Sequence, residues 1–379
     1  MKKTNVRTFT SLFCALLLVL LFLSSFSGCS QTGTKESPRL QVCFEGPFGG
    51  HQFSDCTTAI QQQDFIHLLQ LKSNQIFSIK ANKGISADGF NANRDHADYY
   101  YLHTVGSLLP IQEKQNLVLD FDFVNDSLLT LEILNPSIFK VERKIIGCLC
   151  FMTSDGLIVG HQDIQTQVVL HSPSPVTLLK KDSVYDIEVV DHRFLIVLWA
   201  APLQENQFIN MLSVYLITDL LNNQYTPLYG KAFDHSTQNQ ESYHHCLVSN
   251  KQDLFSVLTY ADTLETYALK NNEIVFMHEM PISFSRDTKN PLEYKNLYMV
   301  CPPYTDQVLV WNESPSTTDQ YVRIIDIRSN TEFQTVEIPK EEFTLEYAMP
   351  FSNQKEKGYF LFYKNEDTNQ TISTYLVLP

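Results

Sequence analysis

Three aspartates in one short segment could bind a cation. Asp120, Asp122 and Asp126 lie close together in the chain, and Ca²⁺ prefers carboxylate oxygens as ligands. A calcium loop counted from Asp120 would need an oxygen ligand at position 5 and a glycine at position 6, where the chain has Val124 and Asn125. We therefore interpret the segment as a strand that has Asp120 and Asp122 on its polar face and the neighbouring phenylalanines on its apolar face.

A second group of metal-capable side chains lies in the segment His244-His245-Cys246, downstream of Asp234 and His235. A protein metal site needs at least three converging ligands, with a spacing such as C-x₂-C or H-x₃-H. Neither spacing is present in this segment. We interpret these residues as solvated loop residues and expect no metal and no cofactor.

Motifs for the common catalytic mechanisms are absent from the sequence. It contains no G-x-S-x-G nucleophile elbow, no H-E-x-x-H zinc motif and no phosphate-binding loop. A catalytic triad that the fold assembles from distant residues stays open. The sequence therefore favours a binding or scaffold role, and a hydrolase or lyase that acts on glycans is the alternative.

The charge of the chain argues against one class of partner. The 379 residues include 28 basic and 42 acidic residues, for a formal net charge of −14. Lys2, Lys3 and Arg7 lie in the first 28 positions, which hold no acid, so the remainder has 25 basic and 42 acidic residues and a charge of −17. Nucleic-acid-binding surfaces are basic because they neutralise phosphates. We therefore expect no nucleic-acid partner.

The N-terminal segment has the features of a targeting signal. Its basic residues precede an unbroken apolar run of twelve residues, Leu12–Leu23, which is too short to cross a bilayer comfortably as a helix and fits the core of a signal peptide. Small residues follow and end at Cys29. This arrangement resembles the signal of bacterial lipoproteins, and the resemblance implies that Cys29 becomes the N-terminus and carries a lipid. The alternative is an ordinary secretory signal with Cys29 as an incidental thiol.

We expect three parts in the chain: a signal peptide over residues 1–28, a flexible tether over 29–39 and a folded domain over 40–379. The tether is small, polar and unpatterned. In the lipoprotein resemblance, Ser30 after the cysteine favours transfer to the outer membrane. The expected location is therefore the bacterial cell envelope, with a lipid anchor in the membrane and an unknown protein or glycan partner.

Six cysteines belong to the folded domain, and export to an oxidising compartment would permit disulfides between them. Cys43 and Cys56 flank a glycine-rich turn and are the pair that we favour. Six cysteines allow fifteen pairings, so the connectivity stays open. We expect the other four to be buried free thiols that act as small apolar residues: Cys148, Cys150, Cys246 and Cys301.

The folded domain has the pattern of many short strands. Runs of β-branched and aromatic residues alternate with Asn, Asp, Ser and Pro. Gln61–Leu71 is the one short stretch with helical character. Glycine is scarce, with 13 residues, and Asn and Asp tolerate positive φ. We expect polar pairs to make the turns in its place: Asn125-Asp126, Asn222-Asn223, Asn271-Asn272 and Ser329-Asn330.

A repeat near fifty residues distinguishes between the all-β folds. Four segments end in an aromatic residue, with spacings of 61, 51 and 52 residues: Trp199, Tyr260, Trp311 and Tyr363. The strand after each of them has a tyrosine, with spacings of 52, 54 and 54 residues: Tyr215, Tyr267, Tyr321 and Tyr375. Such a period, with about four strands a repeat, is typical of β-propeller blades. We interpret the first set as packing residues between blades and not as a carbohydrate-stacking surface.

The last repeat predicts how the ring closes. The sequence stops at Pro379, after the third strand of that repeat, and an apolar strand, Leu40–Phe44, opens the folded domain without a partner. Pairing the two would complete the last blade and leave no orphan edge. The predicted fold is a single all-β propeller in which Cys148–Lys181 forms one blade of four strands. The repeat length favours six blades over seven.

The lipoprotein signal, the acidic body and the degenerate repeats together resemble the TolB-like six-bladed β-propeller lipoproteins of Bacteroidetes. The resemblance is architectural, covers residues 40–379 and includes no diagnostic motif. It implies a binding or scaffold protein more than a defined chemistry.

Overall fold

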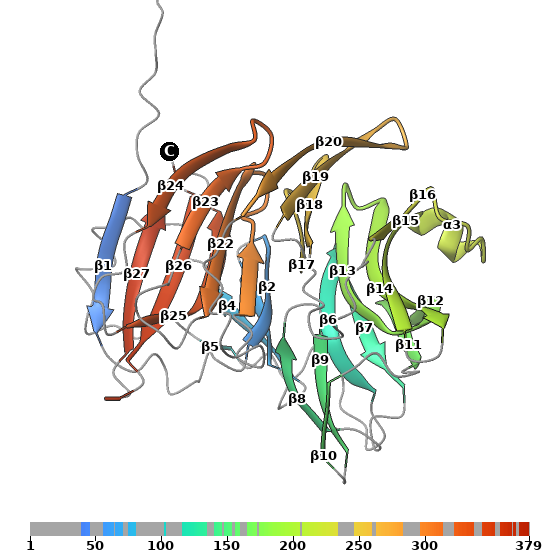
Figure 1. The fold of residues 1–379 in the computed structure, drawn as a ribbon, viewed down its shortest axis with the longest axis horizontal. Helices are drawn as coiled ribbons and strands as arrows, with labels where there is room; N and C mark the ends of the chain where they lie inside the picture. Colours follow the sequence, from blue (N-terminus) through green and yellow to red (C-terminus); the bar gives the residue numbers. More distant parts are fainter. Residues whose placement is uncertain are drawn as a thin grey trace, which may run out of the picture. The chain divides into compact units, whose positions relative to one another are not determined.

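In the computed structural model of the protein, the described residues form six four-stranded antiparallel sheets and one three-stranded sheet (Figure 1). The residues that the structure describes are 39–45, 56–63, 65–70, 75–80, 102–103, 116–134, 140–145, 148–153, 156–159, 165–172, 174–204, 207–233, 246–259, 263–282, 296–313, 322–336, 343–352, 357–365, 367–368 and 371–378. Among them, no helix has the length and apolar character needed to cross a membrane. The signal peptide, Cys29 and residues 30–38 of the tether lie outside the described residues and stay predictions.

We number the four-stranded sheets I to VI in chain order. Sheet I contains β2 (Cys56–Gln62), β3 (Phe65–Gln70), β4 (Gln75–Lys80) and β5 (Leu102–His103). Sheet II contains β6 (Leu117–Val124), β7 (Ser127–Ile133), β11 (Gln165–His171) and β12 (Pro175–Asp182). The inserted sheet contains β8 (Lys140–Ile145), β9 (Cys148–Thr153) and β10 (Gly156–Val159). Sheet III contains β13 (Val184–Val190), β14 (Phe194–Gln204), β15 (Gln207–Leu216) and β16 (Tyr229–Phe233).

The remaining sheets follow the same order of strands. Sheet IV contains β17 (Cys246–Ser249), β18 (Leu254–Thr259), β19 (Thr263–Lys270) and β20 (Glu273–Pro281). Sheet V contains β21 (Asn296–Val300), β22 (Gln307–Glu313), β23 (Val322–Asp326) and β24 (Thr331–Val336). Sheet VI contains β25 (Thr344–Ser352), β26 (Lys357–Lys364), β27 (Thr371–Val377) and β1 (Arg39–Glu45).

The N-terminal strand completes the last sheet, as predicted. β1 pairs with β27 in antiparallel register, with Leu40 opposite Leu376 and Gln41 opposite Tyr375 (Figure 1). The pairing covers the backbone edge that β27 would otherwise expose. The two ends of the folded chain therefore belong to one sheet.

The first strands of the six sheets contact one another in a closed series. The contacts run from β2 to β6, to β13, to β17, to β21, to β25 and back to β2. Sheets that repeat radially in this way form a β-propeller. Five of the sheets have four strands of at least four residues, whereas β5 of sheet I has only two residues. The structure therefore has five complete blades, and the predicted count of six depends on whether sheet I is counted as a blade.

Each blade is packed between two neighbours, so its middle strands are apolar on both faces. Leu195, Ile196, Val197 and Leu198 are four consecutive residues of β14, and all four are fully buried. All six residues of β18 are also buried. Strands that are covered on both faces lose the alternation of polar and apolar residues, which is why these runs are continuous.

Two expectations about secondary structure are wrong. Gln61–Leu71 does not form a helix, because β2 and β3 pair there as a hairpin whose turn has Gln63 at a φ of 51°. The described residues contain one helix, α3 (Ile217–Leu221), where the sequence predicted the end of a strand. Short apolar runs fit either element, and packing against neighbouring strands decides between them.

The predicted blade over Cys148–Lys181 is also wrong. β9 and β10 pair with β8 in the inserted sheet, whereas β11 and β12 join sheet II through β7. Leu129 and Leu131 of β7 are fully buried and lie opposite Leu170 and Val168 of β11. This apolar pairing places β11 beside β7 in sheet II. The inserted sheet is therefore not part of that blade.

The turn prediction is confirmed for asparagine. Positive φ values occur at Asn125, Asn223, Asn271, Asn272 and Asn330. Asparagine thus replaces glycine where the backbone becomes left-handed.

Candidate functional site

Two cavities lie among the first strands and the turns that follow them. The first strands of all six sheets contribute to an inner cavity of about 90 Å³, through Thr58, Asp120, Asp186, Leu247, Tyr298 and Tyr347. A mouth cavity of about 420 Å³ is lined by the ends of these strands and their turns, including Gln62, Gln63, Asn125, Asp126, His192, Lys251, Tyr304 and Ser352. Lys251 lines both cavities.

Acidic residues at alternate positions of the first strands join one sheet to the next. Asp120 accepts a hydrogen bond of 3.2 Å from the Ile187 amide. In the next pair of sheets, Asp186 accepts one of 2.9 Å from the Leu247 amide. The carboxylates are buried and would be costly there without such partners. These bonds fix the position of one blade against its neighbour.

A buried lysine lies between two of these acids. The Nζ atom of Lys251 lies 2.7 Å from Asp122 Oδ2 and 2.7 Å from Glu188 Oε1. Glu188 also accepts a hydrogen bond of 2.7 Å from the Ser249 hydroxyl. The three charged groups come from sheets II, III and IV, so one ammonium group ties three blades together.

The electrostatics of this cluster follow from two carboxylates that share one ammonium group. Burial raises the pKa of Asp122, against the attraction of Lys251. Burial also raises the pKa of Glu188, to about 7, and the nearby Asp122 adds to the rise. Burial alone would lower the pKa of Lys251, but Asp122 and Glu188 outweigh it and raise this pKa. Glu188 can therefore exchange a proton near neutral pH.

At the mouth, left-handed backbone occurs in residue types other than asparagine and aspartate. Asn and Asp account for most of the positive φ values in the described residues. The other residue types with positive φ are Gln63, Ser183, His192, Lys251 and Tyr304, and all of these except Ser183 line the mouth cavity. An L-residue in this conformation costs about 1–2 kcal/mol. Such strain persists where the surrounding structure imposes it, and it is concentrated at functional sites.

Hydrogen bonds join the first turns into a closed ring. Between sheets I and II, Gln62 donates to the Asn125 carbonyl at 2.8 Å. The contacts that follow around the ring are Asn125 N to His192 Nδ1, 3.1 Å; Asp191 N to Lys251 O, 3.2 Å; Tyr304 N to Asn250 O, 2.9 Å; and Lys357 Nζ to Tyr304 O, 2.7 Å. Gln61 and Ser352 close the ring from sheet VI to sheet I by exchanging two hydrogen bonds. The mouth is therefore a continuous rim and not a set of separate loops.

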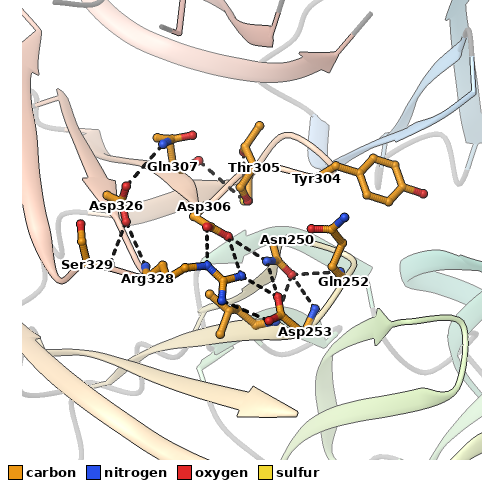
Figure 2. A network of polar contacts seen from close by, with 12 residues as sticks. Asn250, Gln252, Asp253, Tyr304, Thr305, Asp306, Gln307, Asp326, Arg328 and Ser329 are labelled. Carbon is orange, nitrogen blue, oxygen red and sulfur yellow. Dashed lines mark hydrogen bonds and ion pairs between the residues drawn. The ribbon is translucent and has the colours of Figure 1, made fainter. Parts of the chain in front are cut away.

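A charged network on the outer side of this ring joins sheets IV and V. Figure 2 shows Arg328 between the carboxylates of Asp253 and Asp306, with contacts of 2.7 and 2.6 Å. Asn250 donates to both carboxylates, at 3.0 and 2.9 Å. Hydrogen bonds from Arg328 lower the pKa of Asp253. The side chain of Arg328 is 45% exposed, so this network braces the rim but is open to solvent screening.

Trp311 of sheet V and Tyr363 of sheet VI share one apolar core, which agrees with the predicted packing between blades. Trp311 and Tyr363 are buried, and the Trp311 ring stacks on Tyr298 at 5.1 Å between centroids. Trp199 is partly buried, with the Lys181 ammonium group 3.4 Å from its ring centroid. Tyr260 lies outside the described residues. A shared carbohydrate-stacking surface is not formed by the described members of this set.

The second set of aromatic residues has a role that the sequence did not predict. Lys181 of β12 donates to the Tyr215 hydroxyl of the next blade at 3.1 Å. One blade further, Lys231 of β16 donates to the Tyr267 hydroxyl at 3.0 Å and pairs with Glu265 at 2.6 Å. In both cases, a lysine on the outer strand of one blade donates a hydrogen bond to a tyrosine on the third strand of the next blade.

The predicted site residues have different outcomes. Asp120 and Asp122 share one face of β6, but that face is buried and hydrogen-bonded to the next blade. Cys301 is a free thiol, as predicted, and burial raises its pKa to about 12. The side chains of Cys43 and Cys56, and the segment from Asp234 to His245, lie outside what the structure describes. Among the described side chains, no three of His, Cys, Asp and Glu converge as metal ligands.

One polar cluster brings together the residue types of a catalytic triad. His171 Nε2 lies 2.8 Å from Thr130 Oγ1 and 3.4 Å from Glu132 Oε1. Burial would raise the pKa of Glu132, but hydrogen bonds, first of all from His171, lower it to about 2. A triad needs its base to contact the nucleophile and the acid through different ring nitrogens. Because one nitrogen faces both, this cluster lacks the geometry of a triad.

Asp122, Asn125 and Asp126 of the mouth already stood out in the sequence, whereas its other lining residues did not. Lys251, His192 and Tyr304 belong to turns of different repeats, and no motif connects them. A signal was present in the paired acids of two first strands, Asp120 with Asp122 and Asp186 with Glu188. One acid of each pair, Asp122 and Glu188, shares Lys251 as a buried partner, whereas Asp120 and Asp186 each accept from a separate backbone amide.

Comparisons with known proteins give the chain no family. No protein-family model and no curated protein match it. A β-propeller domain of Cps50 (Swd1) from Myceliophteria thermophila is similar at 9% identity, over 84% of this chain and 98% of that chain, with a TM-score of 0.41. A protein from Bacteroides fragilis that is assigned as exported is similar at 10% identity, over 92% and 98%, with a TM-score of 0.42. The fold assignment itself comes from the sheet topology.

Proposed function

We propose that this protein is a binding module of the bacterial cell envelope and that its ligand site is the mouth cavity. The observation that carries the proposal is the placement of strain. Three residues that disfavour left-handed backbone, Gln63, Lys251 and Tyr304, line one cavity, while asparagine occupies most of the other positions with positive φ. A further donor is available deeper in the channel, because the Trp311 indole N–H has no partner among the described residues.

We further propose that the propeller has six blades, with sheet I counted as the first. Both cavities and the ring of hydrogen bonds support this count, since sheet I contributes to each of them. The inserted sheet is then an elaboration of blade II between β7 and β11, which leaves no seventh blade.

The test of the ligand site uses a photo-crosslinker and needs no knowledge of the ligand. Benzoylphenylalanine replaces Gln63, an exposed residue of the mouth, in cells that express the protein. The matched control carries the same group at Lys180, which is exposed on β12 away from both cavities. Irradiation should add mass at position 63 only. Equal adducts at both positions, or none at position 63, would refute the site.

The anchor is a separate proposal that rests on the N-terminal signal. Cys29 would carry the lipid that holds the propeller at the membrane, with the outer membrane as its proposed location. Replacing Cys29 with Ser should release the protein into the soluble fraction of lysed cells. Retention of the variant in the membrane fraction would contradict the lipid anchor.

A glycan-acting hydrolase is the second candidate, because acids and a histidine do meet at the mouth. Asp122, Asp126 and His192 line the same cavity. Glycosidases commonly use two carboxyl groups, one of them with a raised pKa. Asp122, however, is occupied by Lys251, so binding without turnover is the simpler role for this arrangement.

A further inference from the structure

The mouth cavity offers several polar groups that the rim itself does not use. Gln63 donates to Asp126 Oδ1 at 3.0 Å, and Asp126 Oδ2 has no partner among the described residues. His192 accepts through Nδ1, so the neutral ring carries its hydrogen on Nε2 and can donate it. The side-chain amide of Asn125 likewise has no partner in the described part of the chain. The cavity therefore presents donors and acceptors together, as hydroxyl groups require.

The charge of the lining excludes an anionic ligand. Lys251 is the one Lys or Arg among the described residues that line the mouth cavity, and both Asp122 and Glu188 occupy its ammonium group. Asp126 adds a carboxylate whose one side-chain contact within the described ranges is with Gln63. A ligand that carries a carboxylate or a phosphate would meet repulsion and find no free positive group.

Tyr304 presents an aromatic ring at the rim. The residue is 53% exposed, and its backbone has a φ of 62°. Its amide and its carbonyl are both held, by Asn250 and by Lys357, at 2.9 and 2.7 Å. Figure 2 shows the ring pointing away from the network around Arg328. The fold thus holds a tyrosine in an unfavourable conformation with its ring free, which suits a stacking platform.

These three properties together point to one class of ligand. We propose that the mouth cavity binds a neutral carbohydrate, whose apolar face stacks on Tyr304 and whose hydroxyl groups bond to Asn125, Asp126 and His192. The inference rests on the proposed function of this cavity and adds the class of ligand. A cavity of about 420 Å³ is within the range of small-molecule sites. A peptide would find no strand edge there, since the rim is made of turns joined to one another.

The test is calorimetric titration of the full-length protein in detergent. The probes are neutral oligosaccharides of glucose, galactose, mannose and N-acetylglucosamine, with trigalacturonate as the anionic and tetralysine as the cationic comparator. Tyr304→Ala removes the ring, Tyr304→Phe keeps it, and Tyr225→Ala is the control because Tyr225 is also 52% exposed but lies after α3. At least one neutral sugar should bind, with affinity about tenfold weaker in Tyr304→Ala and unchanged in the other two variants.

The other results overturn the inference. Binding of tetralysine or trigalacturonate in place of the sugars would assign another class of ligand, and binding of none of the neutral sugars would reject a carbohydrate. Equal loss in Tyr225→Ala would show that the effect is not at the mouth. The crosslinker at position 63 separates the proposed ligand site from the proposed carbohydrate ligand. An adduct at position 63 without sugar binding would support the ligand site and reject only the carbohydrate.

Discussion

Replacing Lys251 with Met should destabilise the protein strongly and in a pH-dependent way. The substitution keeps a long apolar stem and removes the ammonium group that lies 2.7 Å from both Asp122 and Glu188. Both carboxylates are buried, with side chains 2% and 11% exposed. Removing one partner from a buried ion pair costs about 3–5 kcal/mol, because the other charge is left without compensation. We expect a loss of this size near neutral pH.

The sign of the pH dependence follows from the two carboxyl groups. Without Lys251, their pKa values in the folded state rise further above the unfolded values of about 3.9 and 4.3. The folded state then binds more protons than the unfolded state, so its stability is retained below the unfolded pKa and lost as pH rises. Each group contributes up to about 1.4 kcal/mol per pH unit. The intact protein shares part of this loss, because the pKa of its Glu188 is already about 7. The deficit of the variant should therefore be smaller at about pH 5 than at about pH 7.5, by about 1 kcal/mol.

Urea unfolding of both proteins at the two pH values measures this difference. Lys180→Met is the matched control, because Lys180 is an exposed lysine of β12, and it should change the free energy of unfolding by less than about 0.5 kcal/mol. A deficit below about 1 kcal/mol, or one of equal size at both pH values, would refute the reasoning. Such a result would mean that the two carboxylates find other partners when Lys251 is removed.

Three more substitutions test other parts of the structure. Glu188→Gln should flatten the fall in stability between pH 5 and 8, because the raised pKa of about 7 makes the folded state lose stability as pH rises through that value; an unchanged pH profile would contradict it. Gly358→Ala should cost about 2 kcal/mol or more in thermal unfolding, since a Cβ would lie 1.9 Å from the Leu376 carbonyl oxygen. Gly230→Ala, with no atom within 4 Å, is its control, and equal losses would show that the last blade tolerates the clash. Gln63→Asn should stabilise the protein by up to about 1 kcal/mol, because Asn tolerates the φ of 51° better; a loss of stability would argue against strain at the mouth.

Local patterns gave correct predictions for the strand that closes the last blade and for the turns that contain asparagine. The apolar strand Leu40–Phe44 was predicted to pair with the open edge of the last repeat, and it does. The asparagines of the turns have positive φ. The predicted blade over Cys148–Lys181 is wrong because the choice between β10 and β7 as the neighbour of β11 depends on which apolar surfaces meet, and strand composition does not contain that information.

The sequence by itself determined the class of fold, because a period near fifty residues and a missing strand are properties of the order of residues. It also determined the negative charge, whereas the targeting signal stays a prediction. Only the tertiary structure decided the candidate site. Lys251 lies 129 residues from Asp122, and His192 and Tyr304 come from different blades. Closing the ring brings the first turns of all its sheets to one rim, so side chains without any shared motif become neighbours there.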